Sequence, residues 1–329
     1  MKNTLIELLK TYGATGREAL VREKIKEMIA PHVDEMRVDA LGNLIAIKKG
    51  SANGRRAMVA AHMDQIGFVV ADIDKDGFLR VYNVGGIRRK NSINRRVVFE
   101  NGMSGILSME ERDADQDDRN MQKLFVDIGA TDRAEAEALV QRGDVCVYAP
   151  DVFEMNGAVC GPALDDRAGC ALLIEALKRI KDQAGDIIAV FTTQEEVGCR
   201  GARAAAQGDT PDVAIALDVT WGCDVPKGLL FSMGLRKGAA VKIMDSGLIA
   251  TPCVVSELES LAESNGIPYQ REVLMGGATD GMVINQTGAG VPTGVISVAC
   301  RYVHSATEMV DMGDMEAAAA LLTAFLQHG

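Results

Sequence analysis

The sequence has few aromatic residues and no long apolar run. Phe, Trp and Tyr make up 4% of the 329 residues, and Trp221 is the single tryptophan. The core must therefore be built from Ala, Val, Ile, Leu and Met. No apolar run approaches the ~18 residues that a membrane span needs. The first residues lack the apolar segment of a secretory signal. We expect a cytoplasmic protein without a membrane segment.

Paired cysteines and excess positive charge are also missing. The seven cysteines are dispersed and form no C-x-x-C pair, which favours reduced thiols over a disulfide framework. Lys and Arg number 35 against 46 Asp and Glu, giving a net charge of −11. Such a chain repels phosphate backbones, so nucleic acid is not expected as a partner. The chain also lacks G-x-G-x-x-G and Walker-type loops, which argues against nucleotide binding.

Buried strands and helices alternate in two parts of the chain. Continuous apolar runs predict strands at residues 56–62, 186–192, 213–219 and 291–298. Helices are expected at residues 167–180 and 254–265, and a last helix should run to Leu326 with Asp314 as its N-cap. This alternation predicts a three-layer α/β/α fold. We assign residues 1–66 and 159–329 to this catalytic α/β domain.

Residues 67–158 have a different sequence pattern. Short β-rich runs alternate there with Gly, Asn and Asp, which predicts a small inserted β-domain of barrel-like form. The charged stretch 110–120 has no periodicity and should be a solvated loop. Two local basic groups, Arg88-Arg89-Lys90 and Arg95-Arg96, are expected to serve subunit contacts, which would make this domain a site of dimerisation or higher assembly.

Polar side chains follow several of the predicted buried strands. His62 and His304 are two of only four histidines, and each comes where a buried strand ends. Asp165, Asp218 and the pair Glu195-Glu196 occupy similar positions. Strand ends are where open α/β sheets place their sites. Individually, Asp165 could cap a helix and Glu195 could lie in a solvated turn, but carboxylates beside apolar strands are costly unless they are paired or metal-bound.

This set of side chains suits a pair of divalent cations. Histidine with carboxylate ligands fits Zn, Co or Mn. Three ligand carboxylates and one bridging hydroxide would balance two divalent cations, whereas the same carboxylates without metal would repel one another. Two metals lower the pKa of bound water and polarise a carbonyl. One of two adjacent glutamates could bind metal while the other moves the proton.

Several short segments resemble the motifs of the tetrahedral, or TET, aminopeptidases, which form metallopeptidase family 42 of clan MH. The main ones, in chain order, are Ala61-His62-Met63-Asp64-Gln65-Ile66-Gly67, Ala163-Leu164-Asp165-Asp166-Arg167, Thr193-Gln194-Glu195-Glu196-Val197-Gly198, Leu217-Asp218-Val219-Thr220 and Arg301-Tyr302-Val303-His304-Ser305. Shorter matches are Leu41-Gly42-Asn43-Leu44, Val126-Asp127-Ile128-Gly129-Ala130 and Gly277-Ala278-Thr279-Asp280. The resemblance covers nearly the whole chain.

The resemblance implies five metal ligands. His62 and Asp218 would bind one ion, Glu196 and His304 the other, and Asp165 would bridge both. It also implies two catalytic carboxylates.

Glu195 would be the general base and acid, and Asp64 would orient His62. The implied activity is removal of N-terminal residues from short peptides by a metal-activated water, in a dodecamer built from dimers. Gln65, Trp221 and Ala299-Cys300 depart from the family's usual residues, which leaves the substrate preference open. Trp221 could line the substrate pocket or serve plain packing.

Two alternatives remain at this point. Some relatives have carried endoglucanase names, so an endoglucanase-like or other non-peptide hydrolase on the same scaffold is the first. Glycosidases use two carboxylates without metals, which fits this residue set poorly. The second is a non-catalytic scaffold, which should have lost ligands or the base; all six positions are intact.

Overall fold

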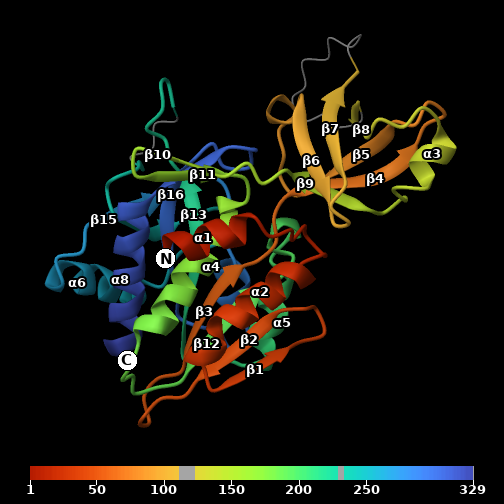
Figure 1. Ribbon diagram of the computed structural model, residues 1–329. Helices are drawn as coiled ribbons and strands as arrows, with labels where there is room; N and C mark the ends of the chain where they lie inside the picture. The colour runs from red at the N-terminus through yellow and green to blue at the C-terminus, as the bar shows by residue number, and fades with distance from the viewer. Residues whose placement is uncertain (111–122, 229–232, 329) are drawn as a thin grey trace.

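The computed structural model describes residues 1–110, 123–228 and 233–328. Figure 1 shows a large α/β part, which holds both ends of the chain, and a smaller β-barrel beside it. The chain enters the barrel after β3 (Ala57–His62) and returns to the main sheet at β10 (Phe153–Met155). Among the described residues, no helix combines the length and the apolar character needed to cross a membrane.

The main sheet has 11 strands and a parallel centre. Strands β12, β3, β13 and β16 lie next to one another, and each neighbouring pair among them is parallel. Antiparallel strands extend the sheet on both sides. In order, its strands are β1 (Glu35–Val38), β2 (Leu44–Lys48), β12 (Ile187–Thr192), β3, β13 (Val213–Trp221), β16 (Thr293–Arg301), β17 (Glu308–Asp311), β11 (Ala158–Gly161) and β10, with β14 (Ala239–Met244) joining β16 to β15 (Tyr269–Val273).

Helices cover both faces of this sheet. Along β12, Ile187, Ala189 and Phe191 face one core, whereas Ile188 and Val190 face the other, because successive strand residues point to opposite faces. The larger core is covered by α1 (Lys2–Leu9), α2 (Ala19–Ile29), α4 (Leu164–Arg179), α6 (Pro252–Ser264) and α8 (Met312–His328). The smaller core is covered by α5 (Arg200–Gly208) and α7 (Gly281–Ile284). The predicted three-layer fold is confirmed.

The barrel closes on itself with six strands and its own core. In barrel order these are β4 (Gly67–Ile73), β5 (Leu79–Val84), β8 (Leu124–Asp127), β7 (Ser104–Met109), β6 (Arg95–Phe99) and β9 (Val145–Tyr148), and α3 (Arg133–Glu137) packs against β4. Phe68 and Tyr148 meet edge to face inside it, with ring centroids 5.6 Å apart. The barrel-like character predicted for this region is confirmed. The exact domain boundaries stay a prediction, and the expected loop at residues 110–120 lies, beyond Glu110, outside the described residues.

One predicted helix start is wrong. The last helix begins at Met312, so Asp314 lies in its first turn instead of capping it. The Asp314 carboxylate accepts the backbone N–H groups of Arg236 and Gly238, each at 2.6 Å. It therefore ties the loop before β14 to this helix, a contact between segments far apart in the sequence.

Candidate metal centre

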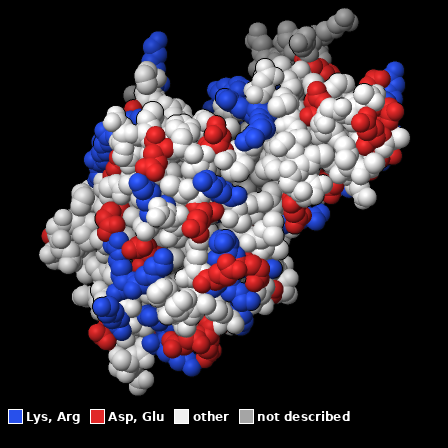
Figure 2. Space-filling view, viewed as in Figure 1, with Lys and Arg blue, Asp and Glu red and all other residues white. Residues whose placement is uncertain are grey.

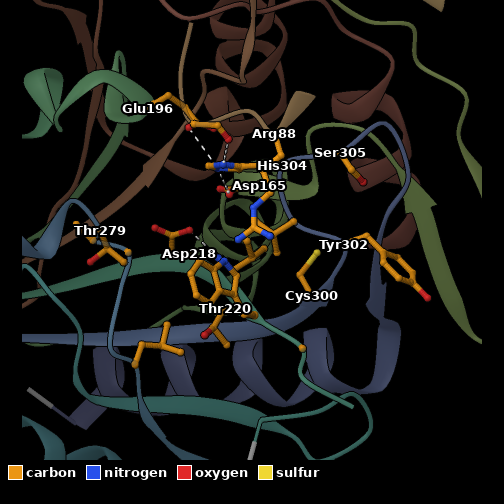
Figure 3. A pocket seen from close by; sticks show the side chains of 18 of the residues that line it. Arg88, Asp165, Glu196, Asp218, Thr220, Thr279, Cys300, Tyr302, His304 and Ser305 are labelled. Carbon is orange, nitrogen blue, oxygen red and sulfur yellow. Dashed lines mark hydrogen bonds and ion pairs between the residues drawn. The ribbon is translucent and has the colours of Figure 1, made fainter. Parts of the chain in front are cut away.

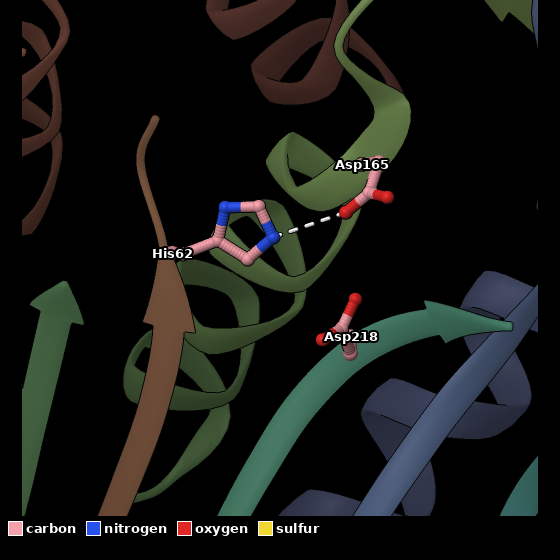
Figure 4. A group of neighbouring side chains, drawn as sticks. All are labelled: His62, Asp165 and Asp218. Atoms are coloured by element: carbon pink, nitrogen blue, oxygen red, sulfur yellow. Dashed lines mark hydrogen bonds and ion pairs between the residues drawn. The ribbon is translucent and has the colours of Figure 1, made fainter. Parts of the chain in front are cut away.

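The predicted site residues converge at one edge of the parallel strands. His62 is the last residue of β3, and Glu195 begins a single 3₁₀ turn, η3 (Glu195–Val197), just after β12. His304 follows β16 by three residues. Asp218 lies within β13 and not at its end as predicted; it comes two residues after Ala216, the last β13 residue that pairs with β3, and is therefore level with His62. Figure 4 shows His62, Asp165 and Asp218 facing one another.

Asp165 lies between the two histidines. Its Oδ1 is 3.0 Å from His62 Nε2, and its Oδ2 is 3.1 Å from His304 Nε2. Two groups of candidate ligands share it: His62, Asp165 and Asp218 form one, and Asp165, Glu196 and His304 form the other, each with its ligand atoms within 4.8 Å of one another. Each carboxylate oxygen of Asp165 thus faces a different group. Asp165 also has non-helical backbone angles inside α4, which turns its side chain toward the site.

The backbone selects the nitrogen that each histidine offers. His62 Nδ1 lies 3.1 Å from the carbonyl oxygen of Asp64, and His304 Nδ1 lies 2.5 Å from that of Gly86 in the barrel loop after β5. A carbonyl oxygen only accepts hydrogen bonds, so Nδ1 carries the proton in both neutral rings. Each Nε2 is therefore left with a free lone pair directed at Asp165, the arrangement of a metal-binding histidine.

Asp64 fixes the turn that carries the two glutamates. Its Oδ1 accepts the backbone N–H of Glu195 at 3.0 Å, and its Oδ2 accepts that of Glu196 at 3.3 Å. Thr15 Oγ1 donates to the same Oδ2 at 2.9 Å. The Asp64 carboxylate lies 3.5 Å from His62 Nδ1, farther than its own carbonyl oxygen. The Asp64 carboxylate thus holds η3 in place, and its predicted role in orienting His62 stays a prediction.

Glu308 is a buried partner of the site that the sequence reasoning missed. Its two oxygens accept the backbone N–H groups of Asp165 at 3.1 Å and of His304 at 2.7 Å. It therefore positions the backbone of two candidate ligands without being one. Strand β17 carries no motif and no strand-end signal at Glu308, so only the pairing of β17 with β16 and β11 brings it here.

A third group of candidate ligands includes Glu195. Cys199 Sγ lies 3.2 Å from Glu195 Oε1, and Asp280 Oδ2 accepts a 2.5 Å hydrogen bond from Thr192 Oγ1. Glu195, Cys199 and Asp280 offer ligand atoms within 4.8 Å of one another. Glu195 Oε2 is 4.0 Å from His62 Nε2, so this carboxylate borders the first candidate group.

Burial governs the protonation of these side chains. It raises the pKa of Asp218 and Glu195 well above their ordinary values, and that of Glu196 to about 8. Burial would also raise the pKa of Asp165, but hydrogen bonds from His304 and His62 hold it below its usual range. For His304, burial acts to lower the pKa, yet the charge of Glu196 and the contact with Asp165 raise it to about 10. The cluster is thus short of positive charge.

The donor set fits divalent cations. Among the described residues, Glu196 Oε1 and Asp166 Oδ2 are buried without a hydrogen-bond partner. Burial and the nearby charge of Asp218 also raise the pKa of Asp166 well above its ordinary value. Unpaired buried oxygens beside two oriented imidazoles are costly unless a cation compensates them. Divalent ions such as Zn, Co or Mn accept this mixture of imidazole and carboxylate ligands.

The cluster borders a cavity of about 980 Å³. Trp221, Leu274 and Met282 supply apolar lining, so Trp221 does line this space. The cavity also reaches residues of the barrel loop, including Arg88, and Figure 3 shows the Arg88 side chain pointing into the space that Asp165 and Asp218 border. A cavity of this size can take a small peptide.

Comparison with known proteins decides the family. The sequence profile of M42 glutamyl aminopeptidase matches residues 42–321. A protein of Acetivibrio thermocellus that is named as an aminopeptidase is 44% identical to this chain over 322 residues. The match covers 97% of each chain. The chain belongs to the M42 family. It is therefore an aminopeptidase, a hydrolase of a metallopeptidase family, and this family implies a divalent metal.

Solved structures agree with this assignment. An aminopeptidase from the archaeon Desulfurococcus kamchatkensis has a TM-score of 0.96 and 36% identity, covering 99% of this chain and 94% of the other. The TET1 peptidase of Pyrococcus horikoshii, which can assemble into a tetrahedron or a large octahedral shell, has a TM-score of 0.89 and 33% identity, covering 99% and 98%. Relatives of this M42 chain thus form large assemblies, which supports self-association.

The glycosidase alternative rests on a name alone. A Thermotoga maritima protein named as an endoglucanase has a TM-score of 0.84 and 31% identity to this chain, covering 99% and 97%. The family profile that spans most of this M42 chain is that of a peptidase. Among the described residues, no contact in the site favours the endoglucanase alternative over the peptidase assignment.

Proposed function

We propose that this M42 chain is a two-metal aminopeptidase that removes single residues from the free N-termini of short peptides. The observation that carries the proposal is the bridging position of Asp165, whose two oxygens face His62 and His304 at 3.0 and 3.1 Å. We assign His62 and Asp218 to one ion, Glu196 and His304 to the other, and Asp165 to both. The ions would be Zn, Co or Mn.

The bound ions would lower the pKa of a water molecule and polarise the scissile carbonyl. Glu195 is assigned as the group that takes the water proton and gives it to the leaving amine. It borders the cluster without belonging to either group of ligands around Asp165. Its backbone N–H is held by Asp64, so η3 presents Glu195 and Glu196 in fixed and different directions.

The form of the cavity supports an exopeptidase. Its inner wall is buried, because Leu274 and Thr279 are 4% and 2% exposed, whereas Arg88 on the barrel side is exposed. We infer that the N-terminal residue of the substrate lies against these two buried residues. The rest of the peptide would leave toward the barrel side.

Assembly and location complete the proposal. On the strength of its TET relatives, we propose a dodecamer built from dimers, with the barrel as a contact region and an interior that admits only short or unfolded peptides. The dispersed cysteines support a cytoplasmic location. Light scattering on the purified protein should give twelve chains of 35.1 kDa per particle.

The direct test is hydrolysis of a panel of aminoacyl-p-nitroanilides. Activity should vanish with chelator and return when Zn, Co or Mn is added back, and the panel would rank N-terminal residues. Activity that persists at full rate in chelator, or hydrolysis of N-acetylated substrates as fast as free ones, would contradict the proposal.

A further inference from the structure

The charged residues around the cavity separate into two kinds. The acidic ones are Asp165, Glu195, Glu196 and Asp218, which are the proposed ligands and base. The other charged lining residues, apart from His304, are all cationic: Arg88, Lys90, Arg95, Lys227 and Lys242. This excess of cationic residues in the lining is unexpected on a chain of net charge −11. Once metals balance the carboxylates, the remaining charge of the lining is positive.

Lys242 does not supply free positive charge. It is 2% exposed and lies 2.7 Å from Glu272 and 3.1 Å from Asp245, which are both buried. Two carboxylates more than balance one ammonium group. The cationic character of the cavity therefore comes from its exposed residues: Lys227 in the loop after β13, and Arg88, Lys90 and Arg95 on the barrel side.

Arg88 and Arg95 belong to that side and have no acidic partner. Arg88 precedes the short η2 turn (Arg89–Asn91), and Arg95 begins β6. Within the described part of the chain, no carboxylate lies at ion-pair distance from either guanidinium group. Figure 2 shows Lys and Arg side chains gathered where the barrel meets the α/β part. Arg95 Nε donates to the carbonyl oxygen of Asn91 at 3.4 Å, but exposed arginines that line a cavity without an acidic partner are available to bind an anion.

The loop that carries Arg88 is held at the metal centre. His304 Nδ1 donates to the carbonyl of Gly86, two residues before Arg88. A Cβ atom added to Gly86 would come within 3.2 Å of the same ring, so the loop packs closely against a proposed ligand. On the other side, the buried Ser92 hydroxyl donates to the carbonyl of Arg88 at 3.2 Å and contacts Tyr148 Oη in the barrel core. Arg88 thus extends from an anchored backbone.

We propose that Arg88, assisted by Arg95, binds a carboxylate group on the leaving side of the substrate. This inference rests on the proposed function, because an exopeptidase that holds the N-terminal residue at the buried wall directs the following residues toward these arginines. In a di- or tripeptide the group is the terminal α-carboxylate; in a longer peptide it is an acidic side chain just after the scissile bond. Guanidinium binds either by two parallel hydrogen bonds.

The test compares substrates that differ in one charge. X is the N-terminal residue that the nitroanilide panel prefers. The pair X-Gly and X-Gly-amide tests the terminal carboxylate, and the pair X-Asp-amide and X-Asn-amide tests the side chain. The variants are Arg88→Gln and, as matched control, Arg96→Gln, an exposed arginine of the same region that does not line the cavity.

For at least one pair, the metal-loaded wild type should favour the carboxylate substrate in kcat/KM by about 10-fold or more, the effect of one charge-assisted hydrogen bond. Arg88→Gln should reduce that ratio toward one, whereas Arg96→Gln should leave it unchanged. The pair that responds identifies the source of the carboxylate. A kcat/KM ratio near one for both pairs in wild type, or equal ratios in wild type and Arg88→Gln, would overturn the inference. If all four substrates are still cleaved in that case, the aminopeptidase proposal stands.

Binding gives a second readout that does not need turnover. In the Glu195→Gln background, calorimetry of the responding pair should show tighter binding of the carboxylate peptide, and adding Arg88→Gln should remove that difference. Equal Kd values for both peptides in the presence of Arg88 would contradict the proposal, whatever the rate data show.

Discussion

Asp64 accepts the backbone N–H of Glu195 at 3.0 Å, so a carboxylate that follows β3 fixes the turn that follows β12. The backbone carbonyl oxygen of the same residue accepts from His62 Nδ1 and orients that ring. Two neighbouring parallel strands are thus joined, at the edge where the metals are proposed to bind, by one buried residue. The positions of a proposed ligand and of the proposed base are not independent.

Asp64→Asn should lower activity without removing the fold. The amide keeps one acceptor oxygen but places an NH₂ group against the N–H of Glu195 or Glu196, so η3 should shift. We expect kcat or metal affinity to fall by about 10- to 100-fold. Asp74→Asn is the matched control, since Asp74 also accepts backbone N–H groups but lies in a barrel turn. Equal kcat and metal content in wild type and Asp64→Asn would show that this link is not needed.

Glu195→Gln should separate catalysis from metal binding. The amide is isosteric but does not take the water proton, so kcat should fall by about 10²- to 10⁴-fold. Metal content, measured by plasma mass spectrometry after dialysis, should stay that of wild type. Glu196→Gln should instead lose metal, because Glu196 is a proposed ligand. Loss of metal in Glu195→Gln would contradict the assignment of Glu195 as base.

Glu308→Gln tests the residue that positions Asp165 and His304 through their backbone N–H groups. Its side chain would keep one acceptor for two backbone N–H groups, so one of them loses its partner. We expect metal affinity to fall by about 10- to 100-fold, measured by competition with a chromophoric chelator. Glu316→Gln, at an exposed ion pair with Arg179, should not change it. An unchanged affinity in Glu308→Gln would remove Glu308 from the site.

The Asp224–Arg301 pair should make a pH-dependent contribution to stability. Arg301 Nε and Nη2 donate to the two Asp224 oxygens at 2.9 and 2.7 Å, which lowers the pKa of Asp224 below its ordinary 3.8. A lowered carboxyl pKa stabilises the folded state above the ordinary value, and this stabilisation is lost as pH falls through the folded-state pKa.

Asp224→Asn should therefore lower the free energy of unfolding by about 1 kcal/mol at pH 7. The difference should shrink as the pH falls below about 4. Urea denaturation of both proteins in chelator would measure it, with Asp182→Asn, an exposed carboxylate, as control. A difference that stays constant or grows on acidification would contradict the ion-pair origin.

The layered fold and the set of candidate site residues could be predicted because their signals are local. Continuous apolar runs indicated β3, β12, β13 and β16, and polar residues such as His62 lie at or near the ends of these runs. The sequence placed Asp218 at the end of its strand, but β13 continues to Trp221. This extension past the part paired with β3 depends on pairing with β16, and no local sequence pattern encodes that pairing.

Contacts between distant segments could not be predicted in the same way. Thr15 and Glu18 have the spacing of a capping box, but in the structure Thr15 donates to Asp64 and Glu18 accepts the N–H of Gln194. Glu308 and the Gly86 carbonyl reach the metal centre only through the pairing of β17 and the entry of a barrel loop. Thr15 and Glu18, which could cap a helix locally, instead form hydrogen bonds with residues distant in the sequence.

Titration of the metal-free protein with Zn²⁺, followed by calorimetry and by nitroanilide hydrolysis, tests the two-metal proposal most directly. We predict binding of two equivalents per chain, with full activity reached only when both are bound, and loss of both from Asp165→Asn because that residue is the proposed bridge. A single equivalent that gives full activity, or an Asp165→Asn variant that keeps two ions, would contradict the account.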